Sequence, residues 1–153
     1  MTKKLYSPLL AALLVLGAAS PWAAQAQTSA STAQAAPLYV ALGEKAGITL
    51  LADDFVNRLK VDTRLAPAFK DANDKNLKLR LGQQFCKLSG GPCGYEGADM
   101  KSAHANMDIT KTDFNALVEV LQASMDARGI PFAVQNQLLA LLAPMHRDVI
   151  TVR

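Results

Sequence analysis

The sequence predicts an all-α fold for the region that follows residue 36. Apolar residues recur there at helical spacing almost throughout, and no run alternates apolar with polar residues as a half-buried strand would. In addition, Gly90-Gly91-Pro92 must end a helix, because two glycines followed by a proline cannot continue one. We therefore expect long helices on both sides of one irregular segment.

The first 26 residues contain the three parts of a cleavable secretory signal, namely Lys3-Lys4, an apolar run from Leu9 to Ala19, and Ala24-Gln25-Ala26. An uncleaved membrane anchor is the alternative, although the apolar run is shorter than the ~20 residues that cross a bilayer. No cysteine lies near the expected cleavage site, so a lipid has no attachment point. We expect a soluble product with no membrane contact after cleavage, in the periplasm or secreted.

The expected signal, the leader and the folded domain differ in charge and in sequence complexity. Removing Lys3 and Lys4 lowers the 16 basic residues to 14 against 13 acidic ones, and these are scattered, which argues against a nucleic-acid partner. Residues 27–36 are low in complexity and predict a disordered leader. The folded domain is expected over residues 37–153, which is enough for one core, as a monomer or weak dimer.

Two long helices are predicted before the irregular segment. The pattern of the first stops at Asp62-Thr63-Arg64, shortly before Pro67. The second ends at Gly90. Their apolar stripes are Ile48, Leu51, Ala52, Phe55, Val56 and Leu59 in the first, and Leu77, Leu81, Phe85 and Leu88 in the second.

Two more long helices are predicted after it. Thr110 with Asp113 three residues on is a helix-capping pattern, and this helix stops at Gly129. Pro131 then starts the last helix. The stripes are Phe114, Leu117, Val118, Leu121 and Met125, then Val134, Leu138, Leu141, Leu142, Met145 and Val149. Residues 90–103 are expected to be mostly loop, and a flat cofactor would explain so long an irregular segment.

A series of motifs, in order over nearly all of the expected domain, resembles a group 1 truncated haemoglobin. The motifs are Tyr39-x-x-Leu42-Gly43, Asp54-Phe55, Leu65-x-Pro67-x-Phe69, Gly90-Gly91-Pro92-x-x-Tyr95-x-Gly97, Met100-x-x-x-His104, Ile109-Thr110-x-x-x-Phe114 and Leu142-Ala143-Pro144. The resemblance implies a truncated globin: a two-over-two α-helical sandwich around haem b, in which the helix before the proximal histidine is reduced to a loop.

The same resemblance assigns roles around the haem. His104 matches the proximal iron ligand, since a neutral imidazole binds iron and leaves the opposite face open. An ordinary loop histidine is the alternative. Phe69 matches the phenylalanine that packs on the haem face, a role compatible with simple core packing. Further cofactor-binding candidates are Leu77, Leu81, Phe85, Met100, Tyr95 and Arg80, the last either beside a haem propionate or on a solvated helix face.

The expected distal pocket departs from the family pattern. Many members have Phe-Tyr where this chain has Phe55-Val56, and Leu77 and Leu81 make the remaining positions apolar. A missing hydroxyl donor forfeits a hydrogen bond of roughly 1 to 3 kcal/mol to bound oxygen. Gln84 restores a polar contact if it faces inward, and a surface-facing Gln84 is the alternative.

Cys86 and Cys93 are predicted to form a disulfide in an oxidising compartment, with two free thiols as the alternative. Closing this small loop would stabilise the fold by about 2.5 kcal/mol. Covalent haem attachment needs Cys-x-x-Cys-His, which is absent, and structural zinc needs more ligands. His146 is either a second ligand or proton donor, or an exposed or interface residue.

Three function classes follow. The leading class is a haem protein that binds O2, and also NO or CO, reversibly, and so carries oxygen without being a dedicated enzyme. The second uses the same haem for NO dioxygenation, nitrite reduction or peroxide removal, with an electron donor as partner; no acid–base pair in the expected pocket supports peroxidase chemistry. The third is a helical interaction module without cofactor, which the retention of His104 and Phe69 argues against.

Overall fold

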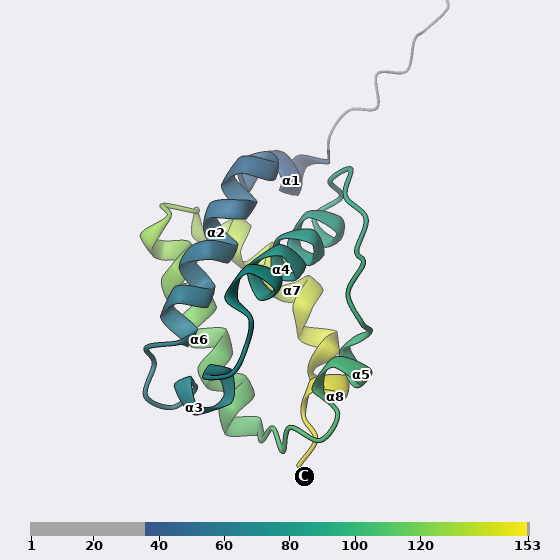
Figure 1. Cartoon of the computed structure of the whole chain (residues 1–153). Helices are drawn as coiled ribbons and strands as arrows, with labels where there is room; N and C mark the ends of the chain where they lie inside the picture. The colour runs from purple at the N-terminus through teal and green to yellow at the C-terminus, as the bar shows by residue number, and fades with distance from the viewer. Residues whose placement is uncertain (1–35, 153) are drawn as a thin grey trace, which may run out of the picture. The chain divides into compact units, whose positions relative to one another are not determined.

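The computed structural model describes residues 36–152, and within this range every regular element is a helix. The expected signal peptide and, apart from Ala36, the expected leader lie outside the described residues. The elements are α1 (Pro37–Ala41), α2 (Glu44–Leu59), α3 (Ala66–Phe69), α4 (Asp74–Leu88), α5 (Met100–His104), α6 (Lys111–Ala127), α7 (Phe132–Leu142), a 3-10 helix (Ala143–Met145) and α8 (His146–Val149) (Figure 1). Among these residues no helix is long and apolar enough to cross a membrane.

Four long helices form the two-over-two sandwich, so the predicted fold is confirmed. Helix α2 packs against both α4 and α6, while α7 contacts α6, α4 and α1 (Figure 1). The rings of Phe55 on α2 and Phe85 on α4 lie 6.3 Å apart at the first of these interfaces. The most deeply buried core side chains include Ile48, Leu51, Leu59, Leu121, Met125 and Leu138.

The helix ends explain where the chain changes direction. Thr110 and Asp113 form the predicted capping box at the start of α6. After α4 the chain reverses at Gly90, which has a φ of 85° that favours glycine. A Cβ on Gly91 would collide with the ring of Tyr39, so only glycine lets the segment after α4 pass this close to α1.

The last predicted helix is not continuous, and this prediction was wrong. Pro144 has no N–H to continue the α-helical hydrogen bonds, and the chain passes through a 3-10 turn between α7 and α8. The short helices α1 and α3 were not predicted, although each has a proline, Pro37 and Pro67, in its first turn. The loop expected before His104 also contains one short helix, α5.

Candidate functional site

His104 is the last residue of α5 and its imidazole is partly buried. Asp99 caps this helix by accepting hydrogen bonds from the backbone and hydroxyl of Ser102, which lower the pKa of Asp99 below its ordinary value. Nδ1 of His104 lies 2.7 Å from the carbonyl oxygen of Met100, one turn earlier. Because a carbonyl only accepts, Nδ1 carries a proton, and in the neutral imidazole Nε2 then has a lone pair that can bind a metal.

One face of α4 contacts α5 and the 3-10 helix through Gln84. The amide nitrogen of Gln84 lies 3.4 Å from the sulfur of Met100 on α5 and 3.4 Å from that of Met145 in the 3-10 helix. Gln84 therefore faces α5 and the 3-10 helix, and a polar contact of Gln84 with a distal ligand stays a prediction. Leu77 and Leu81 precede Gln84 by seven and three residues, so they share its helix face, and both are partly buried.

Phe69 at the end of α3 is also partly buried and packs against the edge of the core. The expected distal residues Phe55 and Val56 are fully buried on α2. Phe85 lies in the core against Phe55, where it has a packing role. A contact of Phe85 with a cofactor stays a prediction.

Arg80, on α4, contacts Glu96 in the segment that follows α4. Its Nη1 lies 3.3 Å from the carboxylate of Glu96 and 3.0 Å from the side-chain oxygen of Gln83. Gln83 also donates its amide to Glu96 at 3.3 Å. Sequence reasoning missed Glu96 and Met145, because their contacts with Arg80 and Gln84 join residues 16 and 61 positions apart. It also missed Gln83, which lies three residues after Arg80 on the same helix.

The remaining candidates of this segment, Tyr95 and the two cysteines, contact residues near them in the chain. The Tyr95 hydroxyl donates to the carbonyl of Ala98 at 2.8 Å. Cys86 and Cys93 form a disulfide with their Cα atoms 5.9 Å apart, which joins the buried end of α4 to the segment that leads to α5.

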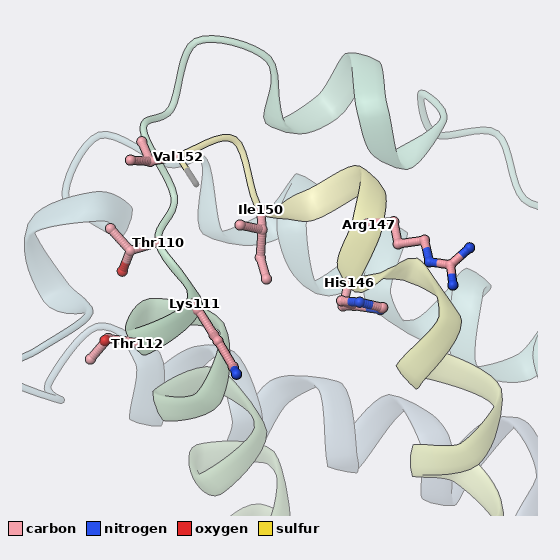
Figure 2. Close-up of a pocket in the computed structure, with 7 residues that line it drawn as sticks. All are labelled: Thr110, Lys111, Thr112, His146, Arg147, Ile150 and Val152. Atoms are coloured by element: carbon pink, nitrogen blue, oxygen red, sulfur yellow. The ribbon is translucent and has the colours of Figure 1, made fainter.

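His146 is exposed on α8, and its ring lies 6.3 Å from that of Phe114. It lines an open hollow of about 580 Å³ together with Thr110, Lys111, Thr112, Arg147, Ile150 and Val152 (Figure 2). None of the residues expected to hold a cofactor lines this hollow. The exposed position agrees with the second of the two readings of His146.

A two-over-two helical sandwich, with a half-buried histidine that presents a free ring nitrogen, defines a protein of the globin class. Residues 37–151 match the bacterial-like globin family, and the chain belongs to this family. Membership implies binding of haem and of small gaseous ligands.

Relatives agree with this assignment. The group 1 truncated haemoglobin of Mycolicibacterium paratuberculosis is 28% identical over 119 residues, which cover 78% of this chain and 88% of that protein. A group 1 truncated haemoglobin of Nostoc commune is 27% identical over 104 residues, covering 68% and 86%. The crystal structure of the truncated haemoglobin of Tetrahymena pyriformis in its Fe(III) form has a TM-score of 0.71 at 25% identity, covering 74% and 97%. The resemblance to group 1 that the motifs indicated is thus confirmed.

Proposed function

We propose that the protein binds O2, and also NO and CO, reversibly at a haem b iron held by Nε2 of His104. The observation that carries this proposal is the 2.7 Å contact between His104 Nδ1 and the Met100 carbonyl, which fixes the tautomer and the orientation of the imidazole. His104 would hold the haem, and the bound iron would supply the chemistry for reversible binding of a diatomic ligand.

The side chains nearby fit a flat apolar group. Phe69, Leu77 and Leu81 are apolar but only partly buried, so they offer apolar surface that a porphyrin would cover. Covering it excludes water from the iron. A cofactor role for these three residues is therefore part of the proposal.

The residues expected on the distal side retain ligands weakly. Val56 has no hydrogen-bond donor, and the Gln84 amide is engaged by two methionine sulfurs. We expect fast release of O2, which suits a reversible binder. Sustained catalytic turnover, by contrast, would require an electron donor, so dependence on a reductase separates binding from enzyme activity.

We further propose that the chain is exported to the periplasm. The signal-like first 26 residues and the disulfide between Cys86 and Cys93 support this, because disulfides persist in oxidising compartments. The mass of the protein in a periplasmic fraction tests it: loss of residues 1–26 is expected, and a full-length cytoplasmic product would contradict it.

The proposed iron ligation is tested with the mature chain, residues 27–153, supplied with haemin. Visible spectra are recorded for the ferric, ferrous and CO-bound forms of wild type, His104→Ala and His146→Ala. We expect a Soret band that shifts with CO in wild type and in His146→Ala, the matched control on exposed α8. In His104→Ala the band should be lost or distorted. Wild type that takes up no haem would overturn the proposal.

A further inference from the structure

The Gln84 side chain joins three elements through two sulfur atoms. Its amide nitrogen, on α4, lies 3.4 Å from Met100 Sδ at the start of α5 and 3.4 Å from Met145 Sδ in the 3-10 helix. All three side chains are partly exposed. A thioether is a weak acceptor but a readily oxidised group, so this junction combines a polar contact with two oxidisable atoms.

We propose that Met100 and Met145 are a modification site at which a peroxide forms methionine sulfoxide, and that this displaces Gln84 and loosens α5. The sulfur lone pair attacks one peroxide oxygen, the S–O bond forms as the O–O bond breaks, and the second oxygen leaves as water after protonation. The sulfur loses two electrons and the peroxide gains them. No further reactant is needed.

On the side of each sulfur that faces Gln84, there is no space for an added oxygen. Nitrogen and sulfur are 3.4 Å apart, whereas an N–H···O hydrogen bond by itself needs about 2.7 to 3.2 Å between nitrogen and oxygen. An oxygen placed between the two atoms therefore forces the Gln84 amide or the methionine to move. The sulfoxide oxygen is also far more polar than the thioether that it replaces.

The movement reaches His104 through α5. Met100 lies one helical turn before His104, and its carbonyl accepts the hydrogen bond that orients the imidazole. Helix α5 has only five residues, and its remaining tertiary support includes α8, which begins directly after Met145. The consequence for haem retention rests on the proposed iron ligation, whereas the oxidation itself does not.

Two other methionines are internal references. Met125 is fully buried in the core, and Met107 is 42% exposed. The mature haem-loaded protein is treated with hydrogen peroxide, which is then removed with catalase, and the sulfoxide at each methionine is quantified by peptide mass spectrometry. We expect oxidation of Met100, Met145 and Met107 while Met125 resists. Unmodified Met100 and Met145 after complete oxidation of Met107 would overturn the site.

The effect on α5 is measured as the rate of haem transfer to an acceptor apoglobin, before and after peroxide. We expect a several-fold acceleration in wild type and in Met107→Leu, and its reversal by methionine sulfoxide reductases. Met100→Leu/Met145→Leu, compared with itself before and after peroxide, should show none. An equal acceleration in this double variant would overturn the proposal.

A second readout separates this proposal from the proposed function. Hydrogen exchange of residues 100–104 is followed in the haem-free mature chain, where peroxide should speed exchange in wild type but not in the double variant. Absence of haem uptake would defeat the iron ligation alone. Unchanged exchange after full oxidation of Met100 and Met145 would defeat the modification switch alone.

Discussion

Val56 is the residue at which the distal side is expected to lack a hydrogen-bond donor. It is fully buried on α2 next to Phe55, and its side chain is apolar. We predict that Val56→Tyr slows O2 dissociation, because a hydroxyl donor in a low-dielectric pocket adds a hydrogen bond of roughly 1 to 3 kcal/mol to a partly negative ligand.

Val56→Phe is the matched control, since it adds the same ring to a filled position without the hydroxyl. Stopped-flow displacement of O2 by CO should give slower release from the tyrosine variant than from the phenylalanine variant, by about 5- to 150-fold for a bond of that strength. Equal rates in the two variants would show that residue 56 does not face the ligand.

His104 and Gln84 show which site residues a sequence can reveal. His104 contacts the carbonyl of Met100, four residues earlier in the same helix. The spacing Met100-x-x-x-His104 is therefore enough to predict this contact. Gln84 instead meets sulfurs 16 and 61 residues away. Its inward orientation depends on how α4, α5 and the 3-10 helix pack, which no local pattern determines.

The disulfide and the contacts of Glu96 with Arg80 and Gln83 join the segment between α4 and α5 to α4. We predict that Cys86→Ser/Cys93→Ser lowers the free energy of unfolding by about 2.5 kcal/mol, the chain-entropy value for a loop of this size. Urea denaturation of this variant and of reduced wild type measures it. Both should unfold at lower urea than oxidised wild type, and coincident curves for all three would contradict the prediction.

The capping box of α6 was predictable because its two residues, Thr110 and Asp113, lie only three positions apart in the sequence. Pro144 could have predicted the break before α8. The apolar stripe continues through Met145 and Val149, however, and therefore indicated one continuous helix. The stripe persists because α7 and α8 both turn apolar residues inward, on either side of the 3-10 turn.

We predict that Thr110→Ala destabilises the fold by about 1 kcal/mol, since its hydroxyl accepts from the Asp113 backbone at the start of a 17-residue helix. Thr112→Ala is the control, because this threonine is exposed in the first turn of the same helix. Thermal unfolding followed by circular dichroism compares them. Equal losses in both variants would mean that the cap contributes nothing specific.

At the scale of the whole molecule, apolar spacing predicted the four long helices of the described residues and roughly where each begins and ends, except that the last one ends at Leu142, before Pro144. The spacing could not predict that α2 packs on both α4 and α6. That arrangement was expected only from the family resemblance, because each helix has one apolar face and several partners would cover it equally well. Long-range polar contacts could likewise not be predicted from the sequence.

One such contact joins the turn after α2 to α6. Arg64 donates to both carboxylate oxygens of Asp62, at 3.1 and 2.8 Å, and to Glu119 on α6 at 2.6 Å. Hydrogen bonds from the Arg64 side chain and backbone lower the pKa of Asp62 from 3.8 to about 2. Since the folded pKa lies below the unfolded one, this stabilisation is fully present above about pH 4 and is lost as the pH falls toward 2.

We therefore predict that Asp62→Asn removes part of the acid sensitivity of the fold. Melting temperatures of the haem-free proteins are measured by circular dichroism between pH 2 and 6. That of Asp62→Asn should be lower than that of wild type at pH 6, and the two should converge toward pH 2. Asp71→Asn, at a carboxylate whose side chain is 89% exposed, is the control and should follow wild type throughout. A constant gap between Asp62→Asn and wild type at every pH would show that the variant removes packing and not a titrating contact.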